Sequence, residues 1–157
     1  EIYAIGRLKS GPERDLAERY TDRLSKAGPA VGLSFGGVTE FAESRARSAS
    51  ERWREEAGVI GTALSTPAAL VLLDERGVHL SSEDFAGRIG RMRDEGKRNC
   101  AFVIGGPDGH DPELRGKADL LISFGRMTWP HQIARVLLAE QLYRAVTILS
   151  GHPYHRA

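Results

Sequence analysis

The sequence predicts an α/β fold with a mainly parallel sheet flanked by helices. Short apolar runs alternate along the chain with longer segments of helical periodicity, which is typical of strand–helix–strand units. Two of these runs, Ala68–Asp74 and Ala101–Ile104, are apolar without alternation, the pattern of strands buried on both faces of a parallel sheet. The 157 residues contain no internal repeat and no linker, so we expect one domain over residues 1–157.

The first part of the chain predicts two strands and two helices in alternation. Ile2–Ile5 is expected to be a strand, and the segment from Pro12 to Gly28 a helix with proline in its first turn and glycine at its end. Val31–Phe35 is expected to form the second strand. The charged segment from Ala42 to about Ala63 predicts a helix with a mostly solvated face.

The second part predicts three strands and two helices. Ala68–Asp74 is expected to be the central strand, followed by a helix that an N-cap at Ser81 begins and Gly96 ends. Ala101–Ile104 and Leu120–Ser123 are expected to be further strands. The last helix is expected from about Pro130 to Leu149.

This last helix has an unusually apolar surface, and it predicts a homodimer. Its apolar stripe comprises Ile133, Val136, Leu137, Leu142 and Val146. A helix this apolar is buried against the sheet, against a partner, or against both. Because the stripe exceeds what one face of a small sheet needs, we expect a second copy of the chain to cover part of it.

Composition limits the classes of partner and compartment. The net charge of +1 is too small for a protein that coats nucleic acid by bulk electrostatics, so any RNA contact is local and DNA is not an expected partner. Cys100 is the single cysteine, which excludes an intramolecular disulfide and suits a reducing cytosol. No apolar run approaches the roughly 18–20 residues of a membrane span, so we expect a cytoplasmic protein with no membrane partner. Glu1 directly precedes an apolar run, and we expect native residues before it.

Candidate binding segments follow the strands, because parallel sheets bind ligands at the carboxyl ends of their strands. The first is the end of Ala68–Asp74, and the second is Gly105–Gly109, whose glycines allow close approach of a ligand to the backbone. The alternative for this loop is a well-formed turn without a ligand. The third is Phe124–His131, which could enclose a flat aromatic base, unless Met127 and Trp129 are core residues.

The end of the chain is the fourth candidate segment. Chain ends usually carry solubilising residues and fray, but Tyr154, His155 and Arg156 stand together here. A metal site built on His152 and His155 is disfavoured, because no third ligand lies at a supporting spacing. We therefore expect no metal.

Several ordered motifs together resemble one family, the ribosomal RNA large subunit methyltransferase H family of the SPOUT superfamily. These motifs are Leu73-Asp74, Val103–Gly109, Thr128–His131, Arg135–Ala145 and His152–Arg156. The resemblance implies an S-adenosylmethionine-dependent enzyme that methylates N3 of a pseudouridine in 23S ribosomal RNA of the assembled ribosome. It also implies a homodimer and a C-terminal trefoil knot, which periodicity could not predict because knots are nearly absent from proteins.

The resemblance also assigns the site residues. Leu73, Gly105 and the run Phe124, Gly125, Arg126, Met127, Thr128 and Trp129 would bind the cofactor. Tyr154, His155 and Arg156 would approach the target base, with Arg156 stabilising the base as its N3 proton leaves. Whether His155, Tyr154 or solvent takes that proton stays open. The alternatives are a transfer RNA methyltransferase of the same superfamily and a non-catalytic ribosome-associated binding factor.

Overall fold

The computed structural model describes residues 1–64 and 68–156, and the chain divides into two compact units. The first unit comprises Glu1–Arg7, Val38–His79 and Arg98–His131. The second unit comprises Leu8–Gly37, Leu80–Lys97 and Gln132–Ala157.

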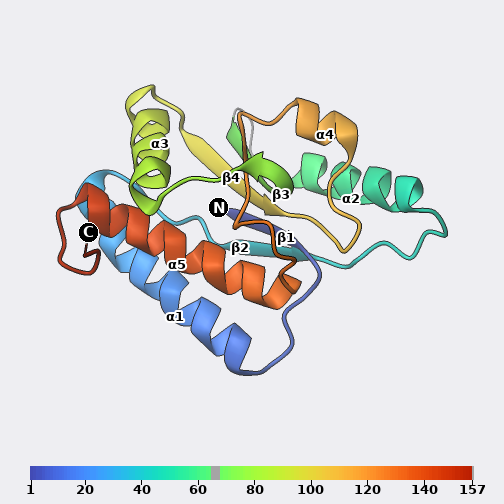
Figure 1. Cartoon of the computed structure of the whole chain (residues 1–157), viewed down its shortest axis with the longest axis horizontal. Helices are drawn as coiled ribbons and strands as arrows, with labels where there is room; N and C mark the ends of the chain where they lie inside the picture. Colours follow the sequence, from blue (N-terminus) through green and yellow to red (C-terminus); the bar gives the residue numbers. More distant parts are fainter. Residues whose placement is uncertain (65–67, 157) are drawn as a thin grey trace. The chain divides into compact units, whose positions relative to one another are not determined.

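The first unit is built on a five-stranded sheet in the order β2-β1-β4-β3-β5 (Figure 1). Its strands are β1 Ile2–Ile5, β2 Val38–Phe41, β3 Ala68–Val78, β4 Asn99–Ile104 and β5 Leu120–Ile122. Every pairing in the sheet is parallel, which confirms the predicted fold class. The centre of the sheet is β4, so the prediction that Ala68–Asp74 is the central strand is wrong by one position.

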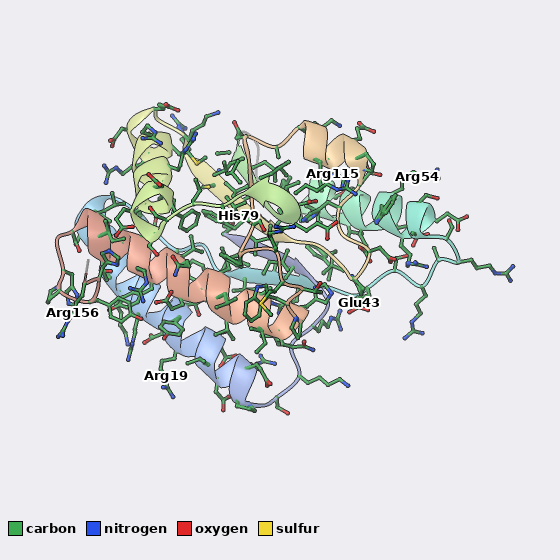
Figure 2. The ribbon with its side chains drawn as sticks, viewed as in Figure 1. Arg19, Glu43, Arg54, His79, Arg115 and Arg156 are labelled. Atoms are coloured by element: carbon green, nitrogen blue, oxygen red, sulfur yellow. The ribbon has the colours of Figure 1, made fainter. Side chains whose placement is uncertain are left out.

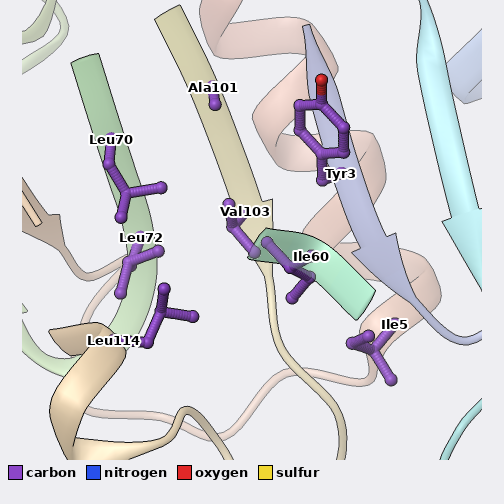
Figure 3. Packing of buried hydrophobic residues seen from close by; sticks show 8 residues of the cluster. All are labelled: Tyr3, Ile5, Ile60, Leu70, Leu72, Ala101, Val103 and Leu114. Atoms are coloured by element: carbon purple, nitrogen blue, oxygen red, sulfur yellow. The ribbon is translucent and has the colours of Figure 1, made fainter. Parts of the chain in front are cut away.

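Two helices pack against one face of this sheet. Ile60 comes from α2 (Ala49–Ala63) and Leu114 from the short α4 (Pro112–Gly116), which the sequence analysis did not predict. They meet a layer of side chains that β1, β3 and β4 direct to the same side (Figure 3). That layer comprises Tyr3, Ile5, Leu70, Leu72, Ala101 and Val103. These apolar contacts hold α2 and α4 beside the strands whose ends carry the candidate site.

The second predicted strand is wrong. Val31–Phe35 is not a strand, because Gly28 and Pro29 begin a 3₁₀ turn, η1 (Gly28–Val31), which Gly32 closes in a left-handed conformation with a φ of 72°. The strand lies later, at β2, where the half-exposed sheet edge does not require a strongly apolar sequence.

The predicted helix from Ala42 begins seven residues late, at Ala49. The first helical turn is determined by a capping box, in which the Ser48 hydroxyl accepts the Glu51 N–H and the Glu51 carboxylate accepts the Ser48 N–H. Segment 42–47 therefore remains a connection between β2 and α2. Charge periodicity alone did not reveal this boundary.

The second unit consists of η1 and three longer helices, α1 (Pro12–Ala27), α3 (Ser82–Asp94) and α5 (His131–Leu149). The predicted helix segments agree with all three. Leu8, Ala17 and Val136 form a small apolar cluster that joins α1 to α5. Ser82 donates a hydrogen bond from its hydroxyl to Gln141 Oε1 at 2.9 Å, which joins α3 to α5. In the described part of the chain, no helix is both long and apolar enough to cross a bilayer.

Candidate functional site

Strand register brings the predicted cofactor segments to one edge of the sheet. Leu73 on β3 pairs with Ile104 on β4 and with Ile122 on β5. Gly105 directly follows Ile104, and the Phe124–Trp129 loop begins two residues after Ile122. Adjacent strands lie about 4.8 Å apart, so the three segments start within about 10 Å of one another across the sheet. They are distant in sequence and adjacent in the first unit.

The loop Gly105–Gly109 is a tight turn at this edge. The Gly109 N–H donates to the Gly106 carbonyl at 2.9 Å, and Gly109 has a φ of 84°, a left-handed conformation that favours glycine. Pro107 occupies the second position of the turn, where its restricted φ is compatible with the fold of the backbone. The prediction of a turn is confirmed, and its role in binding stays a prediction.

His110, which the sequence analysis did not select, closes the space between the ends of β3 and β4. Its Nε2–H donates to the Leu73 carbonyl, with 2.8 Å between the two heavy atoms, and the residue is 3% exposed. A Cβ on Gly105 would lie 2.9 Å from His110 Cε1 and 3.0 Å from the Gly109 carbonyl oxygen. Glycine at position 105 is therefore required by the protein's own packing. A side chain there would displace His110 before it met a ligand.

Burial lowers the pKa of His110, and its hydrogen bond to the Leu73 carbonyl opposes this effect only in part. The neutral ring with hydrogen on Nε2 satisfies that bond. Next to it, the Asp74 carboxylate is 4% exposed and lies 3.6 Å from Arg115 Nη1, on α4. Figure 2 labels Arg115 beside α4. The edge between β3 and β4 is thus lined by a neutral imidazole and a paired carboxylate.

The loop after β5 presents apolar side chains to solvent. Met127 is 76% exposed and Trp129 is 42% exposed, so the alternative that both are core residues is wrong. The backbone of the loop is held locally: Ser123 Oγ donates to the Gly125 carbonyl at 3.0 Å, and Trp129 Nε1 donates to the Phe124 carbonyl at 3.3 Å. Gly125 has a φ of 109°, and a Cβ there would meet no atom within 4 Å. The loop thus leaves two large apolar side chains accessible to a ligand or partner, and their role in binding stays a prediction.

The backbone of β5 crosses β3 closely just before this loop. A Cβ on Gly77 would lie 2.4 Å from the Ile122 carbonyl carbon, and the Ser123 N–H donates to the Val78 carbonyl at 3.0 Å. Only glycine at position 77 allows the two segments to approach this closely. This close contact between β3 and β5 places the first residue of the Phe124–Trp129 loop beside the end of β3.

In the second unit, Tyr154 is packed onto α5. Its hydroxyl donates to Glu140 Oε1 at 3.0 Å, and its ring lies 4.8 Å from the Tyr143 ring. The Arg144 guanidinium lies over the Tyr154 ring, 4.9 Å from its centroid, and it also pairs with Glu140. Burial, followed by hydrogen bonds to Tyr20 and Glu140, raises the pKa of Tyr154. Tyr154 therefore keeps its proton at neutral pH.

His155 is bound on both ring nitrogens, whereas Arg156 is exposed. His155 Nε2 lies 2.7 Å from Glu83 Oε1, and its Nδ1 accepts from Arg144 Nη1 at 3.3 Å. A neutral ring with hydrogen on Nε2 satisfies both contacts. Arg156 follows as an exposed side chain at the end of the described chain (Figure 2). The expectation that this segment is more than a frayed end agrees with these contacts, and Ala157 lies outside the described residues.

Comparison with known proteins decides the family. A family model described as predicted SPOUT methyltransferase matches residues 1–155. A protein of Brucella anthropi named ribosomal RNA large subunit methyltransferase H is 64% identical over 156 residues, which cover 99% of this chain and 98% of that protein. A protein of the same name from Mesorhizobium japonicum is 60% identical with the same coverage. The chain belongs to the ribosomal RNA large subunit methyltransferase H family of SPOUT methyltransferases.

A solved structure is also similar to this family member, at a much lower level. The SpoU methyltransferase AviRb of Streptomyces viridochromogenes, determined in complex with the cofactor AdoMet, is 14% identical with a TM-score of 0.40. The match covers 92% of this chain and 57% of that protein.

Among the described residues, no group of three or more His, Cys, Asp or Glu side chains is arranged to hold a metal ion.

Proposed function

We propose that the protein transfers a methyl group from S-adenosylmethionine to N3 of a pseudouridine in 23S ribosomal RNA within the assembled ribosome. The observation that carries the proposal is the register that aligns Leu73 with Ile104 and Ile122, since it brings all three expected cofactor segments to one edge. Family membership supports the type of reaction, and the names of the relatives support ribosomal RNA as the substrate.

The residues at this edge suit S-adenosylmethionine, which supplies a methyl group already activated on a sulfonium. Gly125 leaves the backbone bare, and the space beside it is open. The exposed side chains of Met127 and Trp129 can cover a flat adenine ring, while backbone amides of the Phe124–Trp129 loop bind its edge. The protein's task is then to align the reacting nitrogen with the methyl group and to exclude water.

In this proposal, the tail acts on the target base. The exposed guanidinium of Arg156 stabilises the negative charge that develops on the base when N3 loses its proton. Tyr154 holds its own proton in the bond to Glu140, so it acts as a hydrogen-bond donor at neutral pH. His155 or solvent takes the N3 proton, with Glu83 available to the imidazole.

The proposal also includes the oligomeric state of the enzyme, its compartment and its partners. We expect a homodimer, because Ile133 and Leu137 on α5 are only half-buried in one chain, whereas Val136, Leu142 and Val146 are buried. We also expect a cytoplasmic enzyme that acts on the ribosome, without a membrane or DNA as partner. A single knotted domain over residues 1–157, as the family resemblance implies, completes the proposal.

The proposal is tested by methylation with tritiated S-adenosylmethionine on assembled ribosomes, free 23S ribosomal RNA and transfer RNA in parallel. We expect transfer to assembled ribosomes and not to free 23S ribosomal RNA or transfer RNA. Mapping the modified nucleotide then identifies the pseudouridine and its N3. Transfer to transfer RNA would support the alternative within the superfamily. Ribosome binding without turnover would support a non-catalytic binding factor.

A further inference from the structure

Helix α2 contacts the Gly105–Gly109 turn through residues on its first two turns. Arg52, Trp53 and Glu56 belong to α2, far before the turn in the sequence, yet all three meet it in the first unit. Nothing in the expected cofactor chemistry requires these side chains. Their common target is a turn that has little stiffness of its own, since three of its five residues are glycine.

Asp108, at the tip of the turn, receives three of these contacts. Arg52 Nε lies 2.6 Å from Asp108 Oδ2 and Arg52 Nη2 lies 3.0 Å from Oδ1, a bidentate pairing. Trp53 Nε1 donates to the Asp108 main-chain carbonyl at 2.8 Å. The hydrogen bond to Arg52 lowers the pKa of Asp108, so the pair stays ionised at neutral pH. Side chain and backbone of one residue are therefore both held by α2.

The same helix ties the base of the turn to the β2–α2 connection. Glu56 is 6% exposed and accepts the Ser44 N–H on Oε1 at 3.0 Å. A Cβ on Gly106 would lie 2.7 Å from Glu56 Oε2, so the carboxylate packs directly on the bare glycine. Arg52 Nη1 also donates to the Ala46 carbonyl at 2.9 Å. The connection and the turn thus form one cross-linked assembly with α2.

We propose that Arg52 and Trp53 are positioning residues that hold the Gly105–Gly109 turn in its cofactor-binding orientation. This inference rests on the proposed function, because it assumes that the turn contacts S-adenosylmethionine. Ordering the backbone of a flexible segment costs conformational entropy. A turn that α2 already holds does not incur this cost when ligand binds, so the contacts increase affinity by pre-organisation. The bidentate geometry requires arginine, since lysine offers a single point charge.

The test measures cofactor affinity and turnover in matched variants. Arg52→Met removes the guanidinium and keeps the stem, and Asp108→Asn removes the charge of the partner. Arg54→Met is the control, because Arg54 lies on the same helix, is exposed and bonds to the Ser50 carbonyl (Figure 2). We expect the Kd of S-adenosylmethionine in calorimetry to rise about tenfold in Arg52→Met and Asp108→Asn, and to stay unchanged in Arg54→Met. KM for the cofactor should rise while kcat at saturating cofactor changes little.

Two further measurements separate positioning from a general loss of folding. In a double-mutant cycle, Arg52→Met and Asp108→Asn together should weaken binding no more than Arg52→Met alone, because Arg52→Met already breaks the pair that Asp108→Asn removes. Arg52→Lys should restore part of the affinity. Additive effects, or wild-type affinity in Arg52→Met, would overturn the inference. Wild-type protein that binds no S-adenosylmethionine would instead overturn the proposed function, so the two failures are distinguishable.

Discussion

At the scale of single residues, His110 connects the ends of β3 and β4, where two of the expected cofactor segments lie. Its hydrogen bond to the Leu73 carbonyl and its packing on Gly105 are satisfied by the neutral ring. Asp74, on β3, and Arg115, on α4, are the charged groups that face it. Asp74 favours the protonated ring and Arg115 opposes it, but burial outweighs both, and the pKa of His110 is lowered.

The lowered pKa predicts a pH dependence of stability. In the unfolded chain a histidine has a pKa of about 6.5, whereas folded His110 takes up its proton only at lower pH. As pH falls below about 6.5, the unfolded state binds the proton first, and the free energy of unfolding decreases. His110→Gln keeps an N–H donor and does not titrate, so it should lose less stability between about pH 7.5 and about pH 5. Urea unfolding at both pH values measures the difference, and equal losses in both proteins would refute it.

At the scale of elements, the tail is an extension of α5. Glu140 and Arg144 lie one helical turn apart on α5 and bind Tyr154 and His155. Glu83, from the beginning of α3, completes the contacts. These contacts with α5 and α3 anchor the tail as far as His155. The side chain of Arg156, the next residue, is exposed.

Removing the C-terminal tail should lower the rate of methyl transfer without weakening cofactor binding. Deletion of Tyr154–Ala157, and Arg156→Ala alone, should reduce single-turnover methylation of ribosomes on the order of 10²-fold, because the interaction with the base is made chiefly in the transition state. The Kd of S-adenosylmethionine should change little, because the cofactor segments lie in the first unit. Arg156→Lys should recover part of the rate.

The control for the tail is Arg91→Ala, which removes an exposed arginine from α3. It should methylate ribosomes at the wild-type rate. If the truncated protein also did so, the tail would be only a chain end, and the roles given to Tyr154, His155 and Arg156 would be withdrawn.

At the scale of the whole molecule, we predict a dimer that depends on α5. Leu137→Arg places a charge on a half-buried apolar position, and an unpaired charge in an interface costs about 3–5 kcal/mol. Light scattering should give about 34 kDa for the wild type, twice the 17.2 kDa of one chain, and the single-chain mass for Leu137→Arg together with lost methylation. Gln132→Arg, at an exposed position of the same helix, should stay dimeric. A wild-type monomer at micromolar concentration would contradict the prediction.

The sequence was sufficient for features that depend on neighbouring residues. Ala69–Leu72 is buried on both faces of β3, as the uninterrupted apolar run predicted. Helices α1, α3 and α5 agree with their expected segments, because proline, an N-cap serine and apolar periodicity act within a few residues of one another. The family motifs also selected three segments as the expected cofactor site, and the strand register shows that these segments are adjacent.

Features that depend on distant contacts had to come from the tertiary structure. The edge strand β2 is defined by its pairing with β1, not by a strongly apolar run of its own. His110 becomes part of the site only because the Leu73 carbonyl lies 2.8 Å away, and Arg52 only because Asp108 lies opposite it. Nothing local in the sequence distinguishes either side chain from a solvated one. Their roles arise from the desolvation and pairing that folding imposes across long separations in sequence.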